Sequence, residues 1–299
     1  MNLGYACINM TLGEHKPKIT TNRSMIKKTF KEKGIKYASE LGLQNSRDLV
    51  EIIKWNNHNG INFFRLTSDL FPWASEYNLT ELPHYNLIEN ILGVAGALAN
   101  KCGQRITSHP GPFNVLVSPK QHVVENTIAD LTLHGEVFDM LGLSRSPYNK
   151  INIHCNGVYG DKIAAMDRFC KNFERLPESV QTRLTVENDD KASMYSVNDL
   201  MYIHERIGIP IVFDYHHHKF CTGDLSEEEA LKLAVSTWND VKPVVHYSES
   251  KALHERNDKL KPQAHSDYIK ELPNTYGLDL DVMVEAKAKE LSILPFINS

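Results

Sequence analysis

The 299-residue sequence has only five cysteines, which are scattered along the chain with no Cys-x-x-Cys pair. This excludes a disulfide framework and a zinc ribbon, and it fits a reducing compartment. No apolar run approaches the ~20 residues that a membrane-spanning helix needs, and no basic and apolar leader precedes the first predicted strand. We therefore expect a cytoplasmic protein without a membrane partner.

Strong net charge and phosphate-binding loops are also missing. The formal net charge is -4, which by itself argues against a protein that coats nucleic acid regardless of sequence. No Gly-x-Gly-x-x-Gly or Gly-x-x-x-x-Gly-Lys-Ser loop follows an apolar run, so the usual nucleotide-binding motifs are absent. Repeats, low-complexity tracts and linkers are lacking too, and we expect one domain over residues 1–299.

What the sequence does contain is a repeated kind of strand ending. Six short apolar runs are typical of strands buried on both faces, and each leads directly to an acid or a histidine. The residues concerned are His109, His154, Glu187, Asp214 with His217, His246 and Glu285. Side chains at the carboxyl ends of such strands would meet at the mouth of whatever the strands form.

Two further apolar runs, at residues 1–5 and 61–68, bring the number of predicted strands to eight. Between the runs, apolar residues recur every three or four positions, as around 49–53, 87–98 and 124–131, and similar segments begin near 162, 197, 226 and 266. This alternation predicts a single (β/α)8 TIM barrel, which takes ~250 residues plus insertions. The alternative is an open doubly wound sheet, but that fold places its ligands at one switch point rather than after nearly every strand.

Two basic stretches are predicted to follow strands one and seven as long loops, over about residues 10–45 and 248–264. Residues 14–40 hold eight lysines and arginines against three acids, and the second stretch includes Lys251 and Arg256. In a barrel both loops would lie on the same face as the strand-end residues. Solvated surface charge explains either stretch alone, whereas both beside an acidic and histidine-rich mouth favour a polyanion lying across a metal site.

The mixture of ligand types predicts which ions the mouth would hold. Histidine, aspartate and glutamate without cysteine suit Mn2+ or Zn2+, and the candidates are too many for one tetrahedral ion. The candidates could hold two or three such ions. Glu187 and Glu285 are natural bridging groups, because a carboxylate has two oxygens. Asp214 and His217 are spaced to converge on one ion, while His216 and His218 are each left open between ligand and merely polar residue.

Several motifs, in order along almost the whole chain, resemble the UV damage endonuclease family. They are LGYACIN at 3–9, FRLTSDLFPWAS at 64–75, SHPG at 108–111, VENDD at 186–190, FDYHHH at 213–218 and VMVEAKAKE at 282–290. The resemblance implies a barrel of the endonuclease IV and xylose isomerase type. It also implies a manganese cluster that cuts damaged double-stranded DNA on the 5′ side of ultraviolet photoproducts.

Carried over position by position, the resemblance implies a ligand set close to the one chosen from strand ends. The implied ligands are His109, His154, Glu187, Asp214, His217, His246, His265 and Glu285. Of these, His265 comes from the resemblance alone. Relatives also tend to have a ligating histidine where this chain has Glu76, and a carboxylate can substitute there. Some relatives carry a lysine where this chain has Val244, two residues before the strand-seven histidine.

The resemblance also implies residues that act on DNA. Glu187 and Glu285 would be catalytic through the ions, with Lys287 or Tyr5 adding charge stabilisation. Lesion contacts are expected from Tyr5, Asn9 and Phe113, and the second basic stretch adds Lys251 and Arg256 as expected DNA contacts. Relatives often have a Gln-aromatic pair after HPG where this chain has Pro112-Phe113, and the phenyl ring can still wedge into a base step.

We therefore expect a metal-dependent DNA repair endonuclease that acts as a monomer. It would leave a 3′-hydroxyl and a 5′-phosphate at a cut immediately 5′ to cyclobutane dimers and 6-4 photoproducts. An abasic-site endonuclease of the same superfamily is the first alternative, because it would use nearly the same ligands. A metal-dependent sugar isomerase or epimerase shares the barrel but should not need basic loops, and a non-catalytic damage-binding protein would bind without nicking.

Overall fold

The computed structural model describes residues 1–297, in which eight parallel strands close into a barrel in sequence order. Strand β1 pairs with β2 on one side and with β8 on the other, which closes the ring and confirms the barrel over the open sheet. The strands are β1 Leu3–Ala6, β2 Phe63–Leu66, β3 Arg105–Ser108, β4 Ile151–His154, β5 Leu184–Glu187, β6 Ile211–Asp214, β7 Val244–Tyr247 and β8 Asp281–Val284. The last two residues of the expected 1–299 domain lie outside the described residues.

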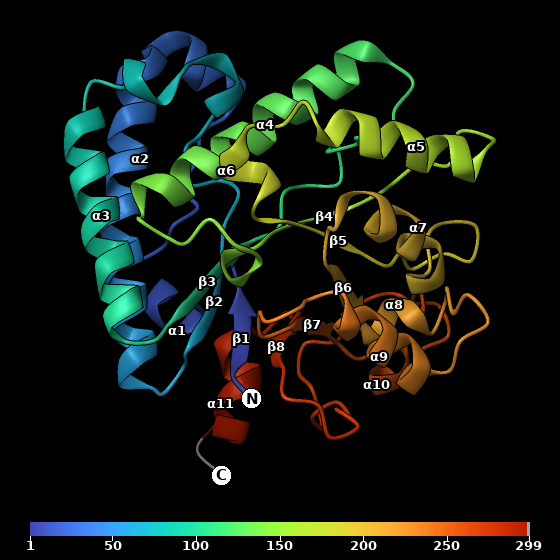
Figure 1. The fold of residues 1–299 in the computed structure, drawn as a ribbon. Helices are drawn as coiled ribbons and strands as arrows, with labels where there is room; N and C mark the ends of the chain where they lie inside the picture. The colour runs from blue at the N-terminus through green and yellow to red at the C-terminus, as the bar shows by residue number, and fades with distance from the viewer. Residues whose placement is uncertain (298–299) are drawn as a thin grey trace.

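Helices lie around the barrel and cover its outer surface (Figure 1). None of those within residues 1–297 is long and apolar enough to cross a membrane. The α-helices are α1 Met10–Gly13, α2 Lys27–His58, α3 Tyr85–Lys101, α4 Gln121–Met140, α5 Lys162–Phe173, α6 Glu178–Gln181, α7 Val197–Ile207, α8 Tyr215–His218, α9 Glu227–Ser236, α10 Lys251–Glu255 and α11 Glu290–Ile297. Three short 3-10 helices, η1 Ala74–Glu76, η2 Leu79–Glu81 and η3 Pro147–Asn149, lie in the connections.

Successive side chains of each strand alternate between the barrel interior and the surrounding helices. A small cluster fills the interior below the mouth, and a much larger apolar cluster lies between strands and helices. The interior cluster consists of Ala6, Phe63, Val212, Trp238, Val244 and Met283. Gly4 faces the same interior, where a Cβ atom would lie 2.6 Å from the Phe63 ring. This alternation decides which strand residues reach the mouth.

The long loop expected over residues 10–45 is wrong in its second half. Helix α2 begins at Lys27 and continues through this stretch, with a break at Gly34, where φ is 62°. Lysine and glutamate are good helix formers, so this segment is helical although it lacks an apolar face. Phe30 anchors it by stacking on Trp73, with ring centroids 5.8 Å apart.

The helix expected from residue 266 is also absent. Between α10 and β8 the described chain forms turns and coil, and Ser250 pairs with His265 in an isolated antiparallel bridge. The backbone amide of Lys251 donates to the carbonyl of Ala264 at 2.7 Å, which closes the loop on itself. Residues 248–264 therefore form a loop that a backbone hydrogen bond closes and that contains one short helix.

Candidate metal centre at the barrel mouth

The strand-end residues meet at one end of the barrel because all eight strands are parallel. Within one strand, residues two apart point to the same face. Contacts among the side chains of Glu187, His246 and Glu285 show that all three point into the barrel interior. An oxygen of Glu187 lies 3.1 Å from Nδ1 of His246, and that nitrogen lies 3.3 Å from an oxygen of Glu285. Side chains from strands β5, β7 and β8 therefore converge at the mouth.

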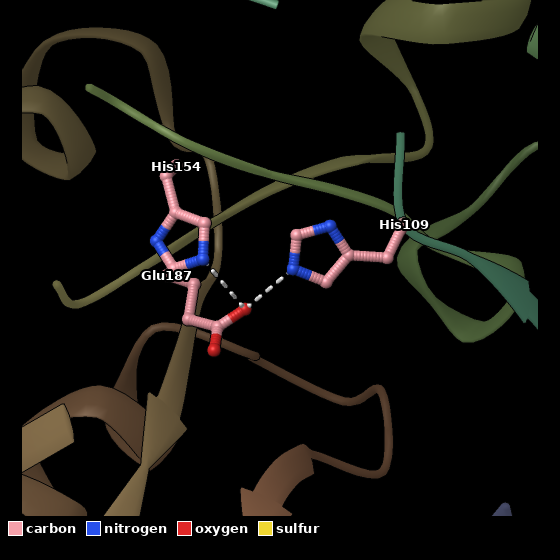
Figure 2. A group of neighbouring side chains, drawn as sticks. All are labelled: His109, His154 and Glu187. Carbon is pink, nitrogen blue, oxygen red and sulfur yellow. Dashed lines mark hydrogen bonds and ion pairs between the residues drawn. The ribbon is translucent and has the colours of Figure 1, made fainter. Parts of the chain in front are cut away.

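Glu187 is the centre of this convergence. Figure 2 shows that His109 and His154 both point a ring nitrogen at the same carboxylate oxygen of Glu187. The distances from Oε2 are 3.0 Å to Nε2 of His109 and 3.7 Å to Nε2 of His154. The amide of Asn152 also donates to Oε2, and Nδ1 of His217 lies 3.4 Å from Oε1. One buried carboxylate thus faces histidines from several strands.

Three groups of side chains at this mouth could each hold a metal ion. In every group one ligand atom from each residue lies within 4.8 Å of the others. The groups are His109, His154 and Glu187; Glu187, Asp214 and His217; and Asp214, His246 and Glu285. Glu187 and Asp214 each belong to two groups, so these two carboxylates lie where bridging ligands would. Glu285 belongs to one group, and its expected bridging role stays a prediction.

The electrostatics of the mouth favour ionised carboxylates beside histidines. Burial alone would raise the pKa of Glu187, but His246 and His154 hold that pKa well below its usual range. Burial likewise opposes ionisation of Glu285, and Arg65 with His246 lowers its pKa well below the usual range. Burial raises the pKa of Asp214 to about 6, although His217 opposes the shift. The site thus concentrates negative charge that a cation would neutralise.

Several buried polar atoms at the mouth make no hydrogen bond within residues 1–297. They include Oε1 of Glu187, Oδ2 of Asp214 and Nδ1 of His246, although this nitrogen lies 3.1 Å from Oε2 of Glu187. Buried polar atoms in native proteins nearly always have a partner, and an ion is one recognised kind of partner. Because these atoms belong to the three groups of ligands, the donor set fits divalent ions such as Mn2+ or Zn2+.

The sequence analysis missed three cations near the carboxylates. Arg65, at the end of β2, forms an ion pair with Glu285. Lys289 lines a cleft of about 390 Å³ together with His109 and Phe113, and burial lowers the pKa of its ammonium group. Lys150 is fully buried immediately before β4. Arg65 shares the inward parity of Phe63 on β2, and Lys150 shares that of His154 on β4, which is the signal that could have found them.

Lys150 contacts the edge of His246 that faces away from the carboxylates. Its Nζ lies 3.0 Å from Nε2 of His246, and burial lowers the pKa of Lys150 to about 7. An ammonium group donates to a bare Nε2, whereas a neutral amine accepts from Nε2–H. The contact is therefore compatible with either tautomer of His246.

Two of the expected ligands lie outside the three groups. His265 is close to them, since its Nδ1 lies 3.1 Å from the backbone oxygen of Glu285 and 3.8 Å from Oε2 of the same residue. Glu76 is exposed and lines a separate groove of about 1110 Å³, which Phe113 and Asp130 also line. Ligation by either residue stays a prediction, and the geometry favours His265.

Tyr5 and Asn9 are turned away from the mouth. Tyr5 is fully buried in the core between strands and helices, where its hydroxyl donates to Oδ1 of Asn56 at 2.7 Å and accepts from Asn9 at 3.0 Å. Asn9 caps α1 by accepting from the amide of Leu12. Contact with DNA through either side chain would require this network to open, so the geometry gives their expected roles no support.

The remaining residues expected to contact DNA differ in exposure and in whether they already form ion pairs. Phe113 is 69% exposed beside the cleft, and Arg256 is also exposed. Lys251 is already paired with Glu255 and Asp267, at 3.3 and 3.2 Å. Lys287 is exposed; Lys289, two residues later, is the cation that lines the cleft.

Comparison with known proteins identifies the family. The model of the UV-endonuclease UvdE family matches residues 1–299. The chain belongs to this family. A UV-damage endonuclease of Schizosaccharomyces pombe is 36% identical over 97% of this chain, and a UV DNA damage endonuclease of Bacillus cereus strain Q1 is 32% identical over all of it.

The extent of these matches differs between relatives. The chain spans 49% of the S. pombe protein and 51% of a UV-damage endonuclease of Neurospora crassa, but 94% of the B. cereus protein. The crystal structure of SacUVDE superposes with a TM-score of 0.86 at 31% identity, covering 100% of this chain and 97% of that one. A D-psicose 3-epimerase of Clostridium cellulolyticum H10 superposes with a TM-score of 0.56 at 12% identity, covering 96% and 85%, which shows a shared fold only.

Proposed function

We propose that this protein is a metal-dependent DNA repair endonuclease that nicks double-stranded DNA immediately 5′ to UV photoproducts. The observation that carries the proposal is the set of three ligand groups joined by Glu187 and Asp214 at the barrel mouth. Membership of the UV-endonuclease family supports the lesion and the reaction class. The products would be a 3′-hydroxyl and a 5′-phosphate.

In this proposal the three groups would hold two or three Mn2+ ions, with Zn2+ or Mg2+ as alternatives. Such ions supply Lewis acidity toward a phosphodiester and lower the pKa of water. The protein itself would orient the imidazole and carboxylate side chains around these ions. Lys289 would add positive charge at the cleft, where the scissile phosphate would lie, and Arg65 pairs with Glu285.

Recognition of the lesion would depend on deformability rather than on base sequence. A photodimer weakens pairing and stacking, so bending or flipping it costs less than for an intact step. Phe113, exposed at the cleft, provides an apolar face that can insert into such a step. Exposed Arg256 and the lysines of α2 would contact the flanking phosphates. We further propose that residues 1–299 act as one domain and as a monomer in the cytoplasm.

The test is nicking of supercoiled plasmid. UV-irradiated, depurinated and untreated plasmids are incubated with the protein in Mn2+ and in EDTA, and the open-circle form is quantified. We expect nicking of irradiated plasmid in Mn2+ alone. Preference for the depurinated plasmid would favour an abasic-site endonuclease. Damage-specific binding without nicking in any divalent ion would make the protein a damage sensor, and equal nicking of all three plasmids would remove lesion specificity.

A further inference from the structure

The histidines at the mouth do not all present the same ring nitrogen. His109 and His154 turn Nε2 toward Glu187, while their Nδ1 atoms lie near acceptors, the carbonyl of Pro110 at 3.2 Å and a carboxylate oxygen of Asp189 at 3.1 Å. His246 is reversed. Its Nδ1 faces Glu187 and Glu285, and its Nε2 points away from them.

The residue behind His246 is a lysine. Lys150 is 0% exposed, and within residues 1–297 the hydrogen bond of its Nζ is to Nε2 of His246, at 3.0 Å. Burying a lysine without a carboxylate partner is costly, so its presence on the interior of the barrel calls for a specific contact. The contact with His246 is the one that the structure provides.

We propose that Lys150 is a positioning residue that keeps Nδ1 of His246 directed at the metal-binding carboxylates. An imidazole can rotate by half a turn about its Cβ–Cγ bond, which would replace Nδ1 by a carbon atom at the same place. The hydrogen bond between Nε2 of His246 and Nζ of Lys150 fixes the ring against this rotation, and it leaves the lone pair of Nδ1 free for an ion when Nε2–H is the donor. Contacts behind a ligating histidine commonly serve this purpose, and removing one costs ~10–100-fold in metal affinity.

This inference rests on the proposed metal cluster. It predicts a change in Mn2+ affinity opposite in direction to the change that the charge of Lys150 alone would cause. A lysine that acted only through its charge would repel Mn2+, so its removal would tighten Mn2+ binding. A lysine that orients His246 has the opposite effect. Lys150→Met keeps the length of the side chain and removes the hydrogen bond, and we expect it to weaken Mn2+ binding ~10–100-fold.

The experiment titrates Mn2+ into the metal-stripped full chain by isothermal calorimetry, without DNA. Lys289→Met is the matched control, because it removes a cation close to Glu285 without touching His246, and its Mn2+ affinity should be equal to that of the wild type or tighter. Thermal unfolding of each metal-free variant verifies the fold. Lys150→Leu, which also removes the hydrogen bond, replaces Lys150→Met if the latter does not fold, with the same expected direction.

Two outcomes overturn the inference. Equal or tighter Mn2+ binding by folded Lys150→Met, while the wild type binds Mn2+ and nicks irradiated plasmid, removes the positioning role and leaves the proposed function intact. Absence of Mn2+ binding by the wild type would overturn both. Weaker binding by Lys150→Met, with the control unchanged or tighter, supports the role.

Discussion

At the scale of single residues, Glu187 is the side chain on which the account depends most. It is fully buried, it belongs to two of the three ligand groups, and histidines hold its pKa well below its usual range. Asp214 also belongs to two ligand groups, but its pKa is raised. Glu187 is therefore the carboxylate best placed to remain ionised between two cations.

Glu187→Gln should abolish cleavage while leaving the binding of damaged DNA largely intact. The substitution preserves shape but removes the negative charge that joins two ligand groups. We expect a loss of at least about 100-fold in the nicking rate, the upper range for losing a residue that merely supports a ligand. Nicking of irradiated plasmid and gel-shift affinity measure the two quantities. Glu89→Gln, on the exposed surface of α3, is the control, and wild-type nicking by Glu187→Gln would remove Glu187 from the centre.

His216, whose ring lies against that of His265 with centroids 5.5 Å apart, gives a pH dependence of stability. It is 1% exposed, and burial lowers its pKa from 6.5 to about 4. Below pH 6.5 the unfolded chain takes up a proton that the folded chain refuses, so the stabilising contribution is present above this range and is lost as the pH falls toward 4.

In EDTA, the wild type should therefore lose about 2 kcal/mol more than His216→Leu in the free energy of unfolding between pH 7.5 and pH 5. Urea denaturation at both pH values measures the difference. The exposed histidine variant His58→Gln should behave like the wild type. An equal pH dependence in wild type and His216→Leu would show that His216 is not held neutral in the fold.

Individual residues show clearly which predictions a sequence allows. The candidate ligands His109, His154 and Glu187 could be predicted because a charged or imidazole side chain at the end of an apolar run is rare without a reason. Lys150 was not predicted, since one lysine before a strand looks like any surface lysine. Its burial depends on the barrel closing around it.

At the scale of elements, strand positions were easier to predict than the helices between them. Each strand is a compact apolar run, whereas the first turns of α2 are rich in lysine, and the sequence therefore predicted a loop there. The segment from residue 266 shows the converse error, because apolar spacing suggested a helix where tertiary contacts hold turns. The spacing of apolar residues shows which face of a segment can be buried. Tertiary packing decides whether that segment forms a helix.

The contact between α3 and the end of α4 allows a direct test of packing. A Cβ atom on Gly96 would lie 1.6 Å from the backbone oxygen of Leu141, while on the same helix Gly93 has 3.9 Å to its nearest such atom. Gly96→Ala should destabilise the protein by about 1–3 kcal/mol through overpacking. Gly93→Ala should be neutral or stabilise it by up to about 1 kcal/mol, because alanine is the better helix former. Urea denaturation compares them, and equal stabilities would contradict the packing described.

At the scale of the whole molecule, the barrel and the place of its site follow from one fact. Eight parallel strands in sequence order bring their carboxyl ends to one mouth, so residues spread over 177 positions from His109 to Glu285 become neighbours. The same barrel occurs in the sugar epimerase that superposes at 12% identity. The fold alone therefore does not choose between sugar and DNA, and the side chains at the mouth carry that choice.

The central claim is that this mouth cuts DNA beside a photoproduct with the help of metal ions. The most direct test is an end-labelled duplex oligonucleotide with one cyclobutane dimer, incubated with the protein in Mn2+ or EDTA and resolved beside a sequence ladder. We predict one cut, immediately 5′ to the dimer, with a 3′-hydroxyl that a DNA polymerase extends, and no cut in EDTA or in the undamaged duplex. Cutting that persists in EDTA, or that is equal on undamaged DNA, would contradict the account.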